Sequence, residues 1–226
     1  MNALVLLVLA LAPGVAIMLF IYLKDKHERE PVGLLLISFL YGALATLLTM
    51  FISVPVNLLI LTKDDDVVQQ FFNAFFKVAL IEEFSKFLFV RFILFNNKNF
   101  NEPFDGIVYA VMVSMGFATL ENVVYVYQYG IATGIMRMVT AVPAHATFAI
   151  IMGYFIGKAK FTHRKVFYYS AVALLTAAAL HGAYDYFLFI SYVPGLSIGV
   201  VVALVTCFIL SRKAIRLHQQ SSPFIE

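Results

Sequence analysis

Two adjacent glutamates and a lysine stand in the middle of an apolar segment, in the stretch LIEEFSKF at residues 80–87. Carboxylates can bind a divalent cation or take a proton from water. A lysine one helical turn later can neutralise one of them, because Glu82 and Glu83 precede Lys86 by four and three positions. A charge at the centre of a spanning helix costs on the order of 3 kcal/mol on insertion scales, so it indicates a functional site.

Three further apolar segments carry side chains of the kinds that ligate metals or move protons. Glu121 and Asn122 lie in GFATLENVVY, His145 lies in VPAHATFAI, and His181 and Asp185 lie in LHGAYDYF. His181 and Asp185 are four positions apart, so the aspartate can accept the second ring N–H and fix the imidazole tautomer. Together with the glutamate pair, these residues can form a divalent metal site with three protein ligands and an open position for water.

Depth in the membrane tests whether these residues can meet. At 1.5 Å per helical residue, Glu121, His145 and His181 lie roughly 10–15 Å below the outer surface, and the glutamate pair roughly 20 Å. These depths are compatible with one site in the outer half of the membrane. The site predicts a hydrolase in which Glu82 or Glu83 accepts a proton from water and returns it to the leaving amine.

The elements that must position these residues are membrane-spanning helices, since 62% of the 226 residues are hydrophobic and 13% are charged. A soluble domain of this size cannot bury that much apolar surface. About seven apolar runs are long enough to cross a hydrocarbon layer roughly 30 Å thick: residues 3–23, 32–61, 67–95, 104–128, 136–157, 166–190 and 193–211. We therefore expect an all-α, polytopic helical bundle forming a single integral-membrane domain over residues 1–226.

The orientation follows from lysines and arginines, which concentrate in cytoplasmic loops. The connections after the first, third, fifth and seventh runs hold Lys24, Lys26, Arg29, Arg91, Lys98, Lys158, Lys160, Arg164, Lys165, Arg212, Lys213 and Arg216. The opposite side has little beyond Lys63 and Arg137. The pattern predicts an outer N-terminus and a cytoplasmic C-terminus. The net charge of +3 then reflects topology and gives no sign of nucleic-acid binding.

The ordered motifs resemble one family. Glu82-Glu83-Phe-Ser-Lys86 matches EExxK, Phe117 to Asn122 matches FxxxEN, and His145 and an HxxxD pair at 181–185 follow on successive segments. Upstream, APGVAIMLFIYLKDKHEREP resembles the family's first helix and the loop after it. This set resembles the PrsW family of intramembrane proteases, in the superfamily of the type II CAAX prenyl proteases and the APH-1 subunit of gamma-secretase. CAAX proteases carry FxxxH where this chain has Glu121, which favours the PrsW branch.

The resemblance implies a multi-pass protease of the plasma or inner membrane. It would make the first (site-1) cut of a single-pass membrane protein, such as an anti-sigma factor, on the extracytoplasmic side. It implies that Glu82, Glu83 and His181 are catalytic, and our leading hypothesis takes Glu121, His145 and His181 as zinc ligands. Lys86, Asn122 and Asp185 would support them. Members of the superfamily have also been interpreted as metal-independent glutamate enzymes.

Less specific interpretations of the same residues stay open. The glutamate pair with Lys86 can be a structural ion pair, and His181 with Asp185 can be a hydrogen-bonded contact between helices. Intramembrane Glu, His and Lys also form proton relays in ion-coupled transporters, although the chain shows no inverted repeat. A non-catalytic scaffold resembling APH-1 is a third alternative, which the complete set of glutamates and histidines disfavours. The sequence leaves the natural substrate and the oligomeric state undetermined.

Overall fold

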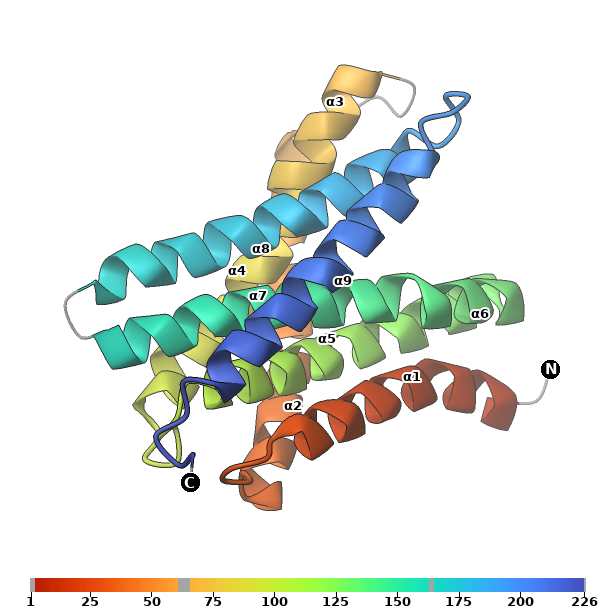
Figure 1. Cartoon of the computed structure of the whole chain (residues 1–226). Helices are drawn as coiled ribbons and strands as arrows, with labels where there is room; N and C mark the ends of the chain where they lie inside the picture. Colours follow the sequence, from red (N-terminus) through yellow and green to blue (C-terminus); the bar gives the residue numbers. More distant parts are fainter. Residues whose placement is uncertain (1–2, 61–65, 163–164, 226) are drawn as a thin grey trace.

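The computed structural model describes residues 3–60, 66–162 and 165–225, and within these ranges it contains helices and no strands (Figure 1). The predicted polytopic helical bundle is confirmed. Lys63 and Arg164, two of the charges used to predict the orientation, lie outside the described residues. The long helices are α1 (Ala3–Lys24), α2 (Val32–Leu59), α5 (Asp105–Tyr129), α7 (Ala141–Thr162), α8 (Val166–Phe189) and α9 (Ile198–Gln219), with the short α6 (Ile131–Val139) before α7.

The predicted span at 67–95 is helical but irregular. It consists of α3 (Val67–Phe72), a π-helical stretch (Asn73–Ala79), α4 (Leu80–Leu88), a second π-helical stretch (Phe89–Ile93) and a 3₁₀ turn (Leu94–Asn96). Six other helical segments among the described residues are long and apolar enough to cross a membrane, with α6 and α7 counted as one. The π-helical stretches on both sides of α4 matter because such irregularities often lie at functional sites.

Helices α5 and α7 form the centre of the bundle. Glycines let the helices approach closely, as small residues do in membrane proteins. A Cβ atom on Gly116 of α5 would overlap the backbone of Phe39 in α2, and one on Gly153 of α7 would overlap the backbone of Gly106 in α5. These contacts fix α2, α5 and α7 relative to one another, and with them the segments that carry Glu121 and His145.

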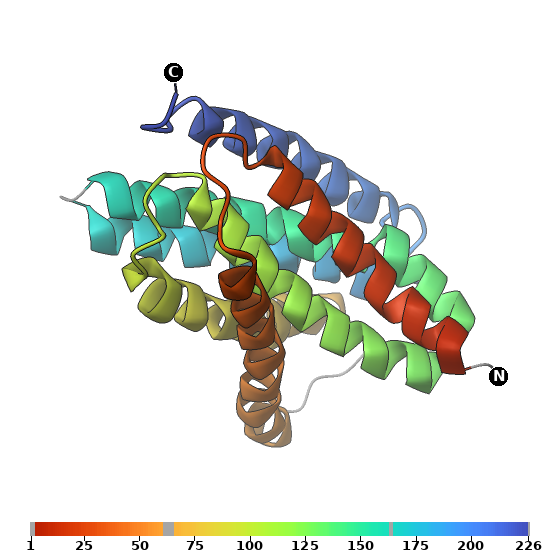
Figure 2. The ribbon, with the colours of Figure 1, turned by 90° about the horizontal axis from the view of Figure 1, so that it is seen from below.

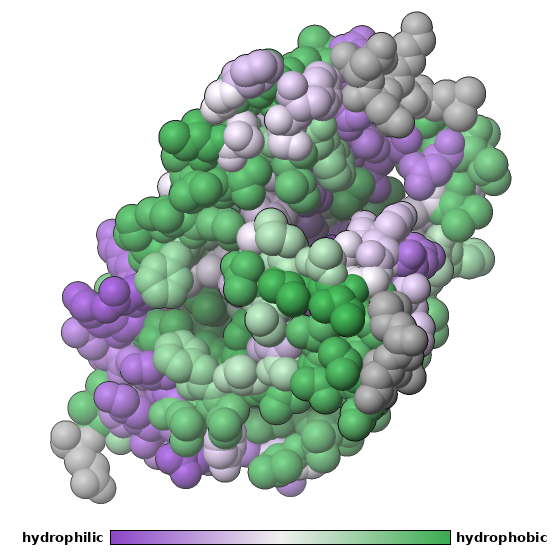
Figure 3. All heavy atoms as spheres, turned by 90° about the vertical axis from the view of Figure 1, so that its right-hand side faces the viewer, coloured by the Kyte–Doolittle hydropathy of each residue, from purple (hydrophilic) through white to green (hydrophobic). Residues whose placement is uncertain are grey.

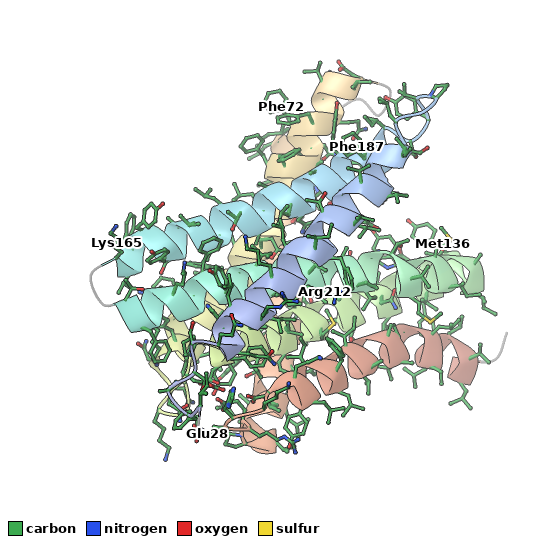
Figure 4. All side chains as sticks on the ribbon, in the orientation of Figure 1. Glu28, Phe72, Met136, Lys165, Phe187 and Arg212 are labelled. Carbon is green, nitrogen blue, oxygen red and sulfur yellow. The ribbon has the colours of Figure 1, made fainter. Side chains whose placement is uncertain are left out.

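The two ends of the bundle are clear in the figures. The N-terminus of α1 lies at the right of Figure 1, and the C-terminus lies near the opposite end of α1. Figure 4 shows Glu28 and Lys165 at this second end, and Met136 and Phe187 at the first. Seen from below, α1 runs beside α5, and α2 extends away from the bundle (Figure 2). Most of α2 beyond Met50 is exposed and apolar, as expected for a helix surrounded by lipid.

A cluster of buried carboxyl groups joins the α1–α2 connection to the start of α5. Asp25, Glu30, Glu102 and Asp105 are each at most 5% exposed. The backbone N–H of Glu30 donates to Asp25 Oδ2, and the N–H of Glu102 donates to Asp105 Oδ2. Burial raises the pKa of Asp25 from 3.8 to about 7, and the nearby Glu102 charge adds to the shift. Burial also raises the pKa of Glu30 from 4.5 to about 7.

Candidate active site

The glutamate pair and Lys86 lie on α4 and form the predicted ion pairs. Lys86 Nζ donates to Glu83 Oε1 at 2.7 Å and lies 3.7 Å from Glu82 Oε2. Glu83 and Lys86 are 1% and 2% exposed. Because α4 turns by about 100° per residue, the two glutamates face different directions. Glu83 points into the bundle, whereas the side chain of Glu82 keeps 12% of its surface exposed.

His181 on α8 joins this pair. Its Nδ1 lies 2.9 Å from Glu83 Oε1, and its Nε2 lies 3.2 Å from Asp185 Oδ2. The second distance is the His–Asp contact that their spacing predicts. The ring of Phe148 from α7 stacks on the imidazole with ring centroids 4.8 Å apart. Two carboxylates and an aromatic ring therefore hold the orientation of His181.

His145 on α7 connects α4 to α5. Its Nδ1 lies 3.2 Å from Lys86 Nζ, and its Nε2 lies 3.0 Å from Glu121 Oε2. Lysine can only donate, so in this arrangement Nδ1 accepts from Lys86 and Nε2–H donates to Glu121. The ammonium of Lys86 also lies 4.1 Å from the centre of the Phe117 ring, a cation–π contact. Lys86 is thus surrounded by side chains from α4, α5 and α7.

Arg137 on α6 is a site residue that the sequence analysis did not assign. Its Nη2 donates to Glu121 Oε2 at 2.8 Å, and its Nε donates to Asn122 Oδ1 at 2.9 Å. The guanidinium also lies 4.1 Å from the centre of the Tyr125 ring. Its signal in the sequence was weak: a single arginine near the predicted outer end of a span, which topology alone could explain. Asn122 also donates to the Ala10 carbonyl of α1, as expected of a polar residue that joins helices.

One set of side chains, Glu82, His145 and His181, could hold a single metal ion. Each offers one ligand atom, and the three atoms lie within 4.8 Å of one another. Glu121 is not in this group. Its Oε2 pairs with Arg137 and His145 instead. One carboxylate and two imidazoles are the ligand set of many hydrolytic zinc sites.

One further observation fits a cation at this point. Glu82 Oε2 is buried without a hydrogen-bond partner. Carboxylates lie at both ring nitrogens of His181, so in this arrangement both nitrogens donate, and His181 would have to release one of these contacts to bind a metal.

The site has access to the end of the bundle where the N-terminus lies. The side chains of Glu121 and Arg137 keep 19% and 13% of their surface exposed. Figure 3, which views the molecule from that side, shows hydrophilic atoms recessed in a hollow between apolar surfaces. The Glu121–Arg137 pair is therefore partly exposed at this end of the bundle.

The helical bundle and its buried carboxylates and imidazoles define a membrane-embedded protein with a hydrolytic type of site. Residues 30–211 match the model of a family described as "PrsW family intramembrane metalloprotease". The chain belongs to this family and is an intramembrane protease.

Curated relatives agree with this assignment. Protease PrsW of Geobacillus kaustophilus is 43% identical over 177 residues, which cover 78% of this chain and 76% of the relative. Protease PrsW of Clostridioides difficile is 37% identical over 83% of this chain and 80% of the relative. Protease PrsW of Bacillus subtilis is 35% identical over 79% of this chain and 80% of the relative. No solved structure matches the chain significantly.

Proposed function

We propose that this protease makes the first cut in single-pass membrane proteins, such as anti-sigma factors, on the outer side of the plasma or inner membrane. The observation that carries this proposal is the convergence of Glu82, His145 and His181 from three helical segments. The site is accessible from the end opposite most of the lysines and arginines, and that end is the outer one if the positive-inside rule holds. A substrate cut there would be cleaved in the outer half of its own span.

We further propose that Glu82, His145 and His181 hold a zinc ion. A zinc ion bound there would supply Lewis-acid chemistry, polarising the scissile carbonyl and lowering the pKa of a water molecule. This set differs from the predicted one by having Glu82 in place of Glu121. Glu121 then serves as the acceptor that fixes the tautomer of His145, and Arg137 offsets its charge.

Within this scheme Glu83 is the general base. Its Oε1 contacts Lys86 and His181 Nδ1, and zinc held by His181 Nδ1 would replace the second of these contacts; its Oε2 is buried without a hydrogen-bond partner. The free oxygen can accept a proton from water and return it to the leaving amine. Lys86 limits the charge at Glu83, and Asp185 orients His181 through Nε2.

A metal-independent glutamate mechanism is the second candidate, and the position of Lys86 favours it. The ammonium lies between Glu83 and His145 Nδ1, so a permanent cation already occupies the centre of the network. In that scheme Lys86 stays in place throughout the reaction. The two mechanisms therefore differ in whether the purified protein contains a metal.

Metal content separates the two mechanisms without relying on activity. We expect elemental analysis of the purified full-length protein to find about one zinc per chain, the stoichiometry of a single site. Glu82→Gln and His145→Ala should each lose most of it, while Glu28→Gln, in an exposed loop, should retain it. Metal-free protein that cleaves substrate in the presence of a chelator would establish the glutamate mechanism instead.

A further inference from the structure

A groove separate from the active site runs along the outside of the bundle between α1, α7 and α9. Its volume is about 530 Å³. The side chains along most of its length are apolar, and they include Ile17, Ile21, Ala146, Ile150, Phe208 and Ile215. The side chain of Gln219 in α9 donates to the carbonyl of Lys24 in α1, which joins the two helices at one end of the groove.

Three cationic side chains line the part of the groove toward that end. Lys24 comes from the last turn of α1, and Arg212 and Arg216 lie one helical turn apart on α9. Figure 4 shows Arg212 on the α9 helix. The described residues offer these three no carboxylate within 4.0 Å, although Lys24 and Arg212 lie 5.5 and 5.9 Å from the centres of the Phe20 and Phe208 rings. The groove therefore has a cationic end without a counter-ion among the described residues, and an apolar remainder.

This combination matches one class of molecule. The positive-inside rule explains why lysines and arginines lie on this side of the membrane, but it does not explain why three of them, from two helices, surround one groove. A phosphate group fits the cationic end, since basic pockets between spanning helices bind anionic lipid headgroups. Acyl chains fit the apolar walls. A free phosphate ion would leave those walls unused, and a zwitterionic lipid would place a positive choline near the cations.

We propose that this groove binds one anionic phospholipid, with its phosphate between Lys24, Arg212 and Arg216 and its acyl chains along α1, α7 and α9. The proposal is independent of the proteolytic mechanism. The bound lipid fills the space between α1 and α9 and packs against the part of α7 that includes Ala146 and Ile150. His145 is adjacent to Ala146 in sequence, so the lipid also supports the helix that carries a site residue.

Native mass spectrometry of the full-length protein in detergent tests the proposal. We expect one phosphatidylglycerol to bind more tightly than phosphatidylcholine with the same acyl chains. Each basic side chain contributes roughly 1 kcal/mol to binding an anionic lipid, so Arg212→Gln with Arg216→Gln should weaken phosphatidylglycerol binding roughly 30-fold. Lys98→Gln with Lys165→Gln removes two cations elsewhere at this end and should leave binding unchanged.

Three outcomes would overturn the proposal. Equal affinity for the two lipids would show that the cations do not select the headgroup. Equal loss in both double variants would show that general surface charge attracts the lipid. Displacement of the lipid by millimolar inorganic phosphate would show that the apolar walls add nothing. All variants should first give the same size-exclusion profile as the parent protein, which confirms that they are folded.

Discussion

Lys86 contacts more polar and aromatic side chains than the partner of a single ion pair needs. It pairs with Glu83 at 2.7 Å, approaches Glu82 and His145, and lies over the ring of Phe117. Removing one member of a buried ion pair costs about 3–5 kcal/mol, because the remaining charge is left uncompensated. In this site the uncompensated charges would be those of Glu83 and Glu82. Lys86 is therefore important both for stability and for the position of the glutamates.

We expect Lys86→Met, which keeps the length of the side chain without its charge, to lower the thermal unfolding midpoint in detergent and to abolish detectable cleavage. Lys77→Met is the matched control, because Lys77 lies on the same helical segment and, among the described residues, donates to the exposed carbonyl of Ile60 and to no site residue. It should change neither property appreciably. A Lys86→Met protein with normal stability and normal cleavage would contradict the assigned role.

The residues of the site were largely predictable, whereas their pairing was not. Intramembrane Glu, His and Asp are conspicuous in an apolar chain, and helical spacing was enough to predict the contacts of Lys86 with the glutamates and of His181 with Asp185. The spacing within one helix does not determine which side chains meet across helices. For this reason the sequence could not show that Glu82, and not Glu121, groups with both histidines.

At the scale of single elements, α6 determines how Glu121 is used. This short helix places Arg137 against Glu121 and Asn122 in the C-terminal third of α5. A carboxylate held by a guanidinium is less available as a metal ligand. The sequence could not reveal this, because α6 and α7 form one long apolar run and the break at Thr140 between them has no strong signal. The sequence also carries no signal for the π-helical stretches on both sides of α4.

We expect Arg137→Ala to reduce cleavage by roughly 10-fold to 100-fold, since it removes the guanidinium that holds the Glu121 carboxylate in position against His145. Arg137→Lys should retain part of the activity, because lysine keeps the positive charge but cannot reproduce both hydrogen bonds of the guanidinium, to Glu121 and to Asn122. The rate should be measured together with bound zinc. Unchanged activity in Arg137→Ala would show that α6 has no influence on the site.

The close contact between α5 and α7 gives a second prediction at this scale. Gly153→Val should force these helices apart, because a Cβ there overlaps the backbone of Gly106 and Ile107. Overpacking of this kind costs about 1–3 kcal/mol or more, so we expect a lower unfolding midpoint and reduced activity. Gly33→Ala is the control, since nothing lies within 4 Å of a Cβ at that position. Equal midpoints for both variants would contradict the packing described.

At the scale of the whole molecule, the composition and the apolar runs were sufficient to predict the class of fold. The number of regular spans was less certain, since the segment 67–95 is helical but interrupted. The buried carboxyl cluster was not predicted at all, because Asp25 and Glu30 belong to a short charged connection that is expected to be exposed. Its burial depends on how the α1–α2 connection packs on the start of α5.

This cluster makes stability depend on pH. Asp25 and Glu30 have a pKa of about 7 in the folded protein, above their ordinary values of 3.8 and 4.5. The folded state therefore binds more protons than the unfolded state between these values, and stability falls as pH rises through 7. We expect the unfolding midpoint to be higher by at least a few degrees at pH 5.5 than at pH 8.

The variants Asp25→Asn and Glu30→Gln should each reduce this dependence, because they remove a group that must be protonated. Glu28→Gln removes an exposed carboxylate from the same connection, and it should reduce the dependence least, because burial is the main cause of the raised pKa of Glu30 and the Glu28 charge adds less. A midpoint that rises with pH over this range, or equal slopes in all three variants, would show that the buried carboxyl groups do not control stability.

The central claim is that Glu82, Glu83 and His181 form a proteolytic site in the outer half of the membrane. The most direct measurement is cleavage of a co-reconstituted single-pass protein, with the cut mapped by mass spectrometry of both fragments. We predict one cut in the outer half of the substrate's span, lost in Glu82→Gln, Glu83→Gln and His181→Ala and retained in Glu28→Gln. Cleavage that persists in all three site variants, or a cut at the cytoplasmic end of the span, would contradict the claim.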